Sequence, residues 1–461
     1  MQKKSLSRRS FVGTSAAASF GALVLPRHIL GGPGFKAPSD TLNVAAIGAG
    51  GMGASNMAQL TSQNIVAICD VDDRRLEQSF FDNQGNAREN RKELKMAYDK
   101  AKRYKDYRRM LERQKDIDAV VIAAPDHIHA TASTMAMRMG KHVYVQKPLT
   151  HSIHEARVLN KVAQETGVVT QMGNQGHSSD DGRKLIEWIW AGAIGPVGEV
   201  HIWTNRPIWP QGMARPKKSE SIPKSMDWDL FLGPAPKVDY HSSYTPFSWR
   251  GWTDYGTGAL GDMGAHLVDH TYWALDLDYP TSIEASGSPF GGDDKASFPL
   301  ATQVHYEFAR GGREPIKVTW YDGGLLPRRP EMMPADAEVN PSGGAIMVGE
   351  KGVLVYDTYG HNPRMYPQHL EEEYANTPQM LPRIPDQNHE MNWARACMGQ
   401  EEASCPFEYA APLTETMLLG VAALYAGYGK KLFWDGKKGE FTNAPEANQY
   451  LHREYRSGWE L

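Results

Sequence analysis

Apolar and polar residues follow two different spacings in the first part of this chain. Short apolar runs of the buried-strand kind lie at residues 42–47, 64–69, 117–123 and 142–145. Between them, apolar residues recur at helical spacing in segments such as 128–139 and 153–166. Strands that alternate with amphipathic helices predict a parallel sheet with crossover helices. We therefore expect an α/β domain over residues 39–167.

The spacing changes after residue 167. Strand-like runs follow at residues 197–204, 281–287, 302–308, 316–321 and 352–357. Helical spacing returns at residues 390–398 and 413–428, and these helices can pack back on the first domain. Strands in succession followed by helices predict an α+β domain, which we assign to residues 168–461.

The first residues carry the pattern of an export signal. Arg8 and Arg9 lie in the stretch SLSRRSFVGT, before an apolar run at residues 16–25, and resemble the twin-arginine consensus. A disordered basic tail is the alternative. A membrane anchor is disfavoured because the stretch at residues 11–25 is about 15 residues long, and roughly 20 are needed to span a bilayer. We assign residues 1–38 to a signal peptide and linker, and expect a periplasmic or otherwise exported protein without a membrane anchor.

Charge and cysteine content limit which partners, disulfides and metal sites the sequence predicts. The formal net charge is −4, and residues 1–38 hold six Lys and Arg and no acid, so the remainder carries about −10. An acidic body argues against nucleic acid as a partner. Cys69, Cys397 and Cys405 offer no disulfide framework and no metal-ligand spacing. We favour unpaired thiols, with a Cys397–Cys405 bridge as the alternative.

A glycine-rich segment lies between the first apolar run and the first helical pattern. Residues 48–53 read Gly-Ala-Gly-Gly-Met-Gly, and strand, G-x-G-x-x-G and helix are the context in which this motif binds a dinucleotide. The diphosphate would rest on the positive end of the helix. We predict cofactor contacts at Gly48, Gly50, Gly51, Met52 and Gly53.

Asp70 stands at the end of the second apolar run, 22 residues beyond Gly48. A carboxylate there accepts hydrogen bonds from the adenosine ribose diol and repels a 2′-phosphate, which favours NAD over NADP. Alternatively, Asp70 caps the next helix, and Arg74 or Arg75 admits a 2′-phosphate. We predict NAD as the cofactor, with NADP less favoured.

Four features resemble the Gfo/Idh/MocA superfamily, named after glucose-fructose oxidoreductase, inositol dehydrogenase and MocA. They are the glycine motif with Asp70, the loop at residues 125–129, Gln146-Lys147-Pro148, and the D-x-x-x-H segment at residues 258–266. The resemblance implies a Rossmann domain followed by an open, mainly antiparallel sheet. That sheet carries the substrate face and often an oligomer interface, so we expect a homo-oligomer, either a dimer or a tetramer.

Loops after the third and fourth apolar runs add candidate cofactor contacts, because open α/β sheets bind ligands at the carboxyl ends of their strands. These candidates are Pro125, His127, His129, Gln146, Lys147 and Asn174. Two close imidazoles can indicate zinc. No Cys or Glu is suitably placed beside them, so we predict no metal. Gln146 replaces the family's usual Glu, and its neutral amide supplies no charge.

Lys147, Asp262 and His266 can together perform hydride-transfer chemistry. Oxidation of a secondary alcohol needs a base for the hydroxyl proton and a group that stabilises the developing oxygen charge. His266 can be the base, Lys147 supplies a cation, and Asp262 can orient the imidazole if the segment is helical. The resemblance assigns the same three roles. The alternative makes Asp262 a helix cap and His266 a solvated histidine.

Polar and aromatic residues in the loops of the second half point to a carbohydrate pocket. Tryptophan faces pack on sugar C–H groups, while Arg and His bond hydroxyls. For any single tryptophan, a place in the core or at a subunit interface is the alternative. The substrate-binding candidates are Gln175, His177, Arg206, Trp209, Trp249, Arg250, Trp252 and Tyr255.

Three functions are compatible with these motifs. The first is an exported NAD-dependent oxidoreductase that interconverts a hydroxyl and a ketone on a sugar or glycoside. Its cofactor would be tightly held and recycled, because little free dinucleotide exists outside a cell. The second is an NAD-dependent glycoside hydrolase or lyase that acts by transient oxidation, elimination and reduction. The third is a sugar-binding protein without catalysis, which Lys147, Asp262 and His266 disfavour. We predict the first, with the second as the alternative.

Overall fold

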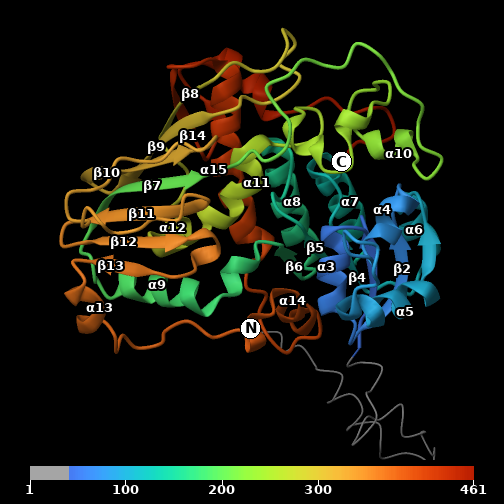
Figure 1. Cartoon of the computed structure of the whole chain (residues 1–461), viewed down its shortest axis with the longest axis horizontal. Coiled ribbons are helices and arrows are strands. Elements are labelled where there is room, and N and C mark those ends of the chain that lie inside the picture. The colour runs from blue at the N-terminus through green and yellow to red at the C-terminus, as the bar shows by residue number, and fades with distance from the viewer. Residues whose placement is uncertain (1–40) are drawn as a thin grey trace, which may run out of the picture. The chain divides into compact units, whose positions relative to one another are not determined.

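Two β-sheets organise residues 42–461 (Figure 1). The structure is a computed structural model that describes residues 41–461, and the predicted signal segment at residues 1–38 lies outside the described residues. The predicted fold class is confirmed, because a parallel sheet with flanking helices is followed by a larger, mainly antiparallel sheet.

The first sheet has six strands in the order β3-β2-β1-β4-β5-β6, and all neighbouring pairs are parallel. They are β1 (Asn43–Ile47), β2 (Asn64–Cys69), β3 (Lys102–Tyr104), β4 (Ala119–Ile122), β5 (His142–Val145) and β6 (Thr170–Met172). β6 lies past residue 167, so the parallel sheet continues beyond the expected boundary. The sequence pattern does not predict β3, because Lys-Arg-Tyr is not an apolar run.

Helices cover both faces of this sheet. One face packs on α6 (Tyr107–Arg113), α7 (Asp126–Arg138) and α8 (Ile153–Thr166). The other face packs on α3 (Met52–Gln59), α5 (Lys92–Lys100) and α14 (His389–Cys397). The short helix α4 (Asp73–Gln78) follows β2. Trp393 of α14 is fully buried against Tyr144 of β5, so a late helix completes the core of the first domain.

The second sheet has nine strands in the order β13-β12-β11-β7-β10-β9-β8-β14-β15. They are β7 (Val197–Thr204), β8 (Ser282–Gly287), β9 (Thr302–Arg310), β10 (Arg313–Tyr321), β11 (Gly343–Gly349), β12 (Val353–Asp357), β13 (Arg364–Tyr366), β14 (Lys431–Asp435) and β15 (Glu440–Phe441). The pairing of β7 with β10 is parallel and the other pairings are antiparallel. The sequence pattern does not predict β11, which begins with two glycines.

Helices α11 (Gly258–Leu267) and α15 (Phe407–Ala426) lie against this second sheet, and α9 (Asp180–Trp190) and α12 (Asp269–Ala274) join the same hydrophobic core. That core includes residues of both sheets, such as Val120 of β4 and Val318 of β10. The remaining helices are α10 (Trp228–Leu232) and α13 (His369–Glu373). The shared core fixes α11 beside the carboxyl end of β5, where the predicted catalytic residues meet.

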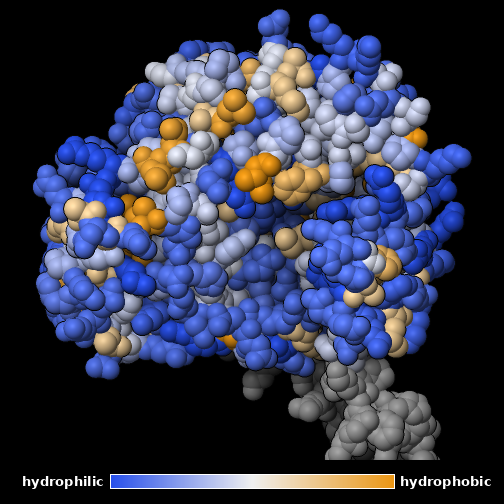
Figure 2. Space-filling view, in the orientation of Figure 1, coloured by the Kyte–Doolittle hydropathy of each residue, from blue (hydrophilic) through white to orange (hydrophobic). Residues whose placement is uncertain are grey.

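The face of the molecule drawn in Figure 2 is largely hydrophilic, with separate apolar spots. Exposed large apolar side chains include Met96, Ile208, Leu300 and Met380. Scattered apolar side chains are normal for a protein surface. Within residues 41–461, no helix combines the length and the apolar composition that crossing a bilayer requires.

Candidate active site

The glycine-rich loop between β1 and α3 is shaped to accept a phosphate. Gly48 adopts a φ of 75°, and a Cβ there would lie 2.6 Å from the backbone nitrogen of Ala124. A Cβ on Gly53 would overlap the carbonyl oxygen of Gly48, so glycine is needed for this approach of helix to strand. Among the described residues, no side chain caps the N-terminus of α3, which begins at Met52, so its positive end is available to an anion.

Asp70 is oriented by two backbone N–H groups. Gly50 N–H donates to Oδ2 at 2.9 Å, and Asp72 N–H donates to Oδ1 at 3.0 Å. Burial raises the pKa of Asp70, and these two hydrogen bonds act in the opposite direction. Each carboxylate oxygen keeps a further lone pair, so Asp70 can also accept a ribose hydroxyl.

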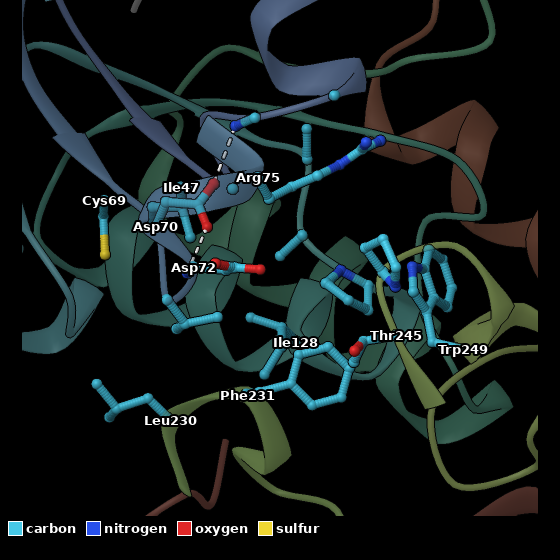
Figure 3. A pocket seen from close by; sticks show the side chains of 18 of the residues that line it. Ile47, Cys69, Asp70, Asp72, Arg75, Ile128, Leu230, Phe231, Thr245 and Trp249 are labelled. Atoms are coloured by element: carbon cyan, nitrogen blue, oxygen red, sulfur yellow. Dashed lines mark hydrogen bonds between the residues drawn. The ribbon is translucent and has the colours of Figure 1, made fainter. Parts of the chain in front are cut away.

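Asp70 and the glycine-rich loop line a cavity of about 390 Å³ (Figure 3). Its opposite side is largely apolar and includes Ile128 and Phe231. This combination of glycine-rich backbone, ribose-binding carboxylate and apolar wall fits a dinucleotide. Arg75 also lines the cavity, and a guanidinium can pair with a phosphate. The carboxylate that favours NAD and a cation that can admit a 2′-phosphate are therefore both present.

The predicted cofactor residues divide into two groups. Those that line the cavity are Gly48, Gly50, Gly51, Met52, Asp70 and Pro125, while Gly53 lies directly behind the loop. The residues that do not line it are His127, His129, Gln146, Lys147 and Asn174.

Lys147 and Asp262 form a buried ion pair between the end of β5 and helix α11. Lys147 Nζ donates to Asp262 Oδ1 at 3.0 Å and to its carbonyl oxygen at 2.7 Å. Arg250 Nε donates to the same Oδ1 at 3.1 Å. Burial acts to raise the pKa of Asp262, but the charges of Lys147 and Arg250 hold it well below its usual range. Asp262 is therefore an ionised carboxylate that holds two cations.

His266 follows Asp262 by one turn of α11, so the predicted catalytic residues gather in one place. Its side chain is buried, and Nδ1 has no hydrogen-bond partner among residues 41–461. Burial, followed by the charge of Lys147, holds the pKa of His266 well below its usual range. A neutral imidazole with an unpaired nitrogen can accept a proton.

Tyr359 is a site residue that the sequence does not predict. Its ring meets that of His266 edge to face, with 4.5 Å between the centroids. Tyr359 adopts a φ of 67°, a left-handed conformation that costs energy for an aromatic residue. A Cβ on Gly176 would lie 2.8 Å from Tyr359 Cα, so glycine at 176 allows this close approach. Burial, and then the charge of Asp262, raises the pKa of Tyr359.

Gln146 belongs to a buried amide and carboxylate network. Its Nε2 donates to Asn56 Oδ1 at 3.1 Å, and Asn56 Nδ2 donates to Glu390 Oε1 at 2.6 Å. Tyr144 OH also donates to Glu390, at 3.3 Å. Helix α14 places the Glu390 carboxylate in this network, so a neutral side chain at position 146 avoids a second carboxylate beside it.

The rings of His127 and His129, which we predict to border the cofactor, are buried. His127 Nε2 lies 2.8 Å from the carbonyl oxygen of Phe231. His129 lies 2.8 Å from the carbonyl oxygens of both Ala124 and Pro148. Burial lowers the pKa of His129 to about 4. The imidazole of His129 thus connects the loops that carry Pro125 and Lys147.

His177 and Asn174, predicted as a substrate contact and a cofactor contact, belong to a buried hydrogen-bond network around Asp269. His177 Nδ1 lies 3.0 Å from Asp269 Oδ1, and Asn174 Nδ2 donates to Asp269 Oδ2 at 3.0 Å. The ring of His177 stacks on Trp273 at 4.0 Å. Only 3% of the His177 side chain is exposed.

Among the predicted substrate residues, Trp252 and Tyr255 are part of a buried aromatic cluster, and Trp209 is buried with its Nε1 donating to Gln211. All three rings therefore pack inside the protein. Trp249 and Arg250 do line the cavity.

Two further candidates lie around the catalytic group. Arg206 is close enough to Tyr359 for its charge to act on the tyrosine pKa, in the lowering direction. Gln175 is half-buried, and its Nε2 donates to Glu390 at 3.4 Å. Arg206 thus lies near Tyr359, and Gln175 belongs to the network of Glu390.

The sequence also makes predictions about metal ligands and cysteines. Within residues 41–461, no three His, Cys, Asp or Glu side chains gather in an arrangement that could hold a metal ion. Cys69, Cys397 and Cys405 are free thiols, so the alternative of a Cys397–Cys405 bridge is wrong for this structure.

Two protein-family models match the chain. One, described as an oxidoreductase family with an NAD-binding Rossmann fold, covers residues 42–174. The other, the C-terminal alpha/beta domain of the Gfo/Idh/MocA oxidoreductase family, covers residues 202–314. Together they span more than half of the sequence.

Similar proteins include sugar-converting enzymes. A 1,5-anhydro-D-fructose reductase of Ensifer adhaerens is 25% identical over 177 residues, which are 38% of this chain and 42% of the relative. A glycosyl hydrolase family 109 protein of Shewanella pealeana is 27% identical over 211 residues, which are 42% of this chain and 44% of the relative. Each match thus covers less than half of the relative's length.

Among solved structures, the WlbA dehydrogenase of Bordetella pertussis, in complex with NADH and UDP-GlcNAcA, superimposes with a TM-score of 0.56 at 16% identity. The superposition covers 86% of this chain and 99% of that protein. At this identity the likeness is one of fold.

Proposed function

Because the chain belongs to the Gfo/Idh/MocA family of oxidoreductases, we propose that it interconverts a hydroxyl and a ketone on a sugar or glycoside, with NAD as cofactor. The observation that carries this proposal is the meeting of Lys147, Asp262 and His266 beside the cavity that fits a dinucleotide. Similarity to a sugar reductase supports a carbohydrate substrate.

The roles of the three residues follow from their electrostatics. A bound nicotinamide accepts or returns the hydride. His266, a neutral imidazole, takes the proton of the reacting hydroxyl, and Lys147 stabilises the developing oxygen charge. Asp262 fixes Lys147 through two hydrogen bonds and has its charge balanced by Arg250. The ring of Tyr359 offers an apolar face to a sugar beside His266.

The proposal also covers which cofactor the protein binds and how the protein retains it. Asp70 supports NAD, although Arg75 in the same cavity could pair with a 2′-phosphate. We propose export by the twin-arginine pathway, on the sequence pattern at Arg8 and Arg9. An exported enzyme would hold its NAD tightly and regenerate it in place. A homo-oligomer belongs to the same proposal.

The second candidate is an NAD-dependent glycoside hydrolase that oxidises a ring hydroxyl, eliminates the aglycone, adds water and reduces the ring again. Similarity to a glycosyl hydrolase family 109 protein favours it. The same three residues would serve the oxidation and the final reduction.

The test is a native mass and an ultraviolet spectrum of the purified full chain, followed by a panel of sugars and glycosides. Net oxidoreductase activity predicts a rise in near-ultraviolet absorbance as one sugar reduces the bound NAD, and its reversal by a keto-sugar. Aglycone release without a net absorbance change would instead establish the hydrolase. Binding of a sugar with neither response, unaltered by Lys147→Ala, would contradict both and leave a sugar-binding protein.

A further inference from the structure

One wall of the cavity beside Asp70 is formed by two segments that follow the Rossmann domain in the sequence. Helix α10 contributes Leu230 and Phe231, and the segment 452–461 contributes Trp459. In Figure 3, Leu230 and Phe231 lie across the cavity from Arg75. Only 6% of Trp459 is exposed, so this indole is held inside the protein rather than lying on its surface.

Segment 452–461 is docked through several charged contacts. Arg456 Nε donates to the carbonyl oxygen of Gly233 at 2.7 Å, and its Nη1 pairs with Asp229 at 2.7 Å. On the other side, the Arg108 guanidinium lies 3.8 Å from the centre of the Trp459 ring and donates to the carbonyl oxygen of Gly458. Trp459 is thus clamped between helix α6 and helix α10.

The position of this wall identifies the part of the cofactor that it faces. The glycine-rich loop takes the diphosphate and Asp70 takes the adenosine ribose, so the base lies beyond Asp70. Tyr107, Ile128 and the wall residues also line the cavity. Tyr107 follows β3, whose Tyr104 pairs with Cys69, the residue before Asp70. Flat aromatic bases stack on such side chains, and this binding does not require a charge.

We propose that Trp459, held by Arg108 and Arg456, and helix α10 enclose the adenine ring and so make segment 452–461 part of the cofactor site. This inference rests on the proposed NAD-dependent function. It supplies the physical basis for retention, because the base cannot leave on this side until the segment undocks. Neither family model reaches segment 452–461, since the second ends at residue 314.

The experiment compares dinucleotide retention in the full chain and in Trp459→Ala. NAD content after purification is measured by chromatography of the acid-released nucleotide, and the release of NADH is followed by its fluorescence. Loss of one base-stacking contact predicts about 10- to 100-fold faster release from Trp459→Ala. Trp459→Phe keeps an aromatic ring and is expected to release NADH nearly as slowly as the wild type. Trp190→Ala removes a half-exposed indole elsewhere and is the matched control.

Each outcome is decisive. Slow release from Trp459→Ala, equal to the control, overturns the inference and leaves the proposed function intact. A wild-type protein that neither carries NAD nor binds added NADH overturns the proposed function, and the inference with it. If Trp459→Ala fails to fold, Arg456→Gln loosens the same segment without altering a residue that lines the cavity, and faster NADH release from this variant is required.

Discussion

Lys147 contacts both the side chain and the main chain of Asp262. Its Nζ lies 3.0 Å from Oδ1 and 2.7 Å from the carbonyl oxygen. Two contacts fix the ammonium group more tightly than one ion pair could, and the carbonyl contact fixes it relative to the backbone of α11. Since Arg250 shares the same Oδ1, the carboxylate balances two cations.

This charge arrangement predicts unequal effects of removing each partner. Asp262→Asn leaves Lys147 and Arg250 without a counterion, and we expect it to lower the free energy of unfolding by about 3–5 kcal/mol. Lys147→Met leaves Asp262 paired with Arg250 and should cost less. Both variants should lose turnover of the sugar found by screening, by about 100-fold or more. Urea unfolding and steady-state kinetics give the two measurements.

The control for this pair is Lys161→Met. Lys161 is 76% exposed and lies 3.8 Å from Glu165, so its loss should change stability by no more than about 0.5 kcal/mol. A larger stability loss in Lys147→Met than in Asp262→Asn would contradict the interpretation that Lys147 and Arg250 share the carboxylate of Asp262.

The buried network of Gln146 yields a second prediction. Gln146→Glu would place a carboxylate against the acceptor oxygen of Asn56. Only the side-chain amide of Asn56 would then separate this carboxylate from the buried Glu390. We expect a loss of about 1–3 kcal/mol at pH 7, because a buried charge would lack a donor. Adding Glu390→Gln should recover part of this loss. The coupling is measured by a double-mutant cycle in urea, and strictly additive effects would refute the network.

A third prediction concerns the glycine-rich loop. Gly53→Ala adds a Cβ that overlaps the carbonyl oxygen of Gly48, so the loop must shift. We expect a stability loss of about 1–3 kcal/mol and weaker NADH binding, measured by fluorescence titration. Gly198→Ala is the matched control, because its Cβ would meet no described heavy atom within 4 Å. Unchanged NADH affinity in Gly53→Ala would show that the loop does not shape the cofactor site.

The sequence predicts the features of this protein that depend on local pattern. The strand, glycine loop and helix from β1 to α3 are contiguous, and Asp262 and His266 share a helix. The exposure of an aromatic residue, in contrast, depends on neighbours that are distant in the chain. Trp252 and Tyr255 therefore look like sugar-binding residues in sequence but pack in a core cluster.

Distant partners also explain Gln146 and Tyr359. The carboxylate that makes a neutral residue suitable at position 146 belongs to Glu390, which only the packing of α14 brings near. Tyr359 reaches His266 because a left-handed turn places it there, and no local pattern marks an aromatic residue for that conformation. Both relationships are set by tertiary structure.

The last prediction uses Asp126, which is buried beside the catalytic charges and accepts a hydrogen bond from Thr257 Oγ1 at 2.8 Å. Burial raises the pKa of Asp126 to about 7, with the charge of Asp262 acting in the same direction. Between pH about 4 and 7 the folded state therefore binds more protons at this carboxyl than the unfolded state does. Asp126 thus lowers the free energy of unfolding as pH rises through this window.

Asp126→Asn removes that penalty while keeping an oxygen that can accept from Thr257. Its stability relative to the wild type should be similar at pH 4, rise by up to about 1.4 kcal/mol per pH unit towards pH 7, and then stay level. Urea unfolding at a series of pH values measures the difference. Asp293→Asn, on an exposed loop, should stay within about 0.5 kcal/mol of the wild type throughout. A difference for Asp126→Asn that is constant with pH, or that grows towards acid, would mean that the pKa of this carboxyl is not raised in the folded protein.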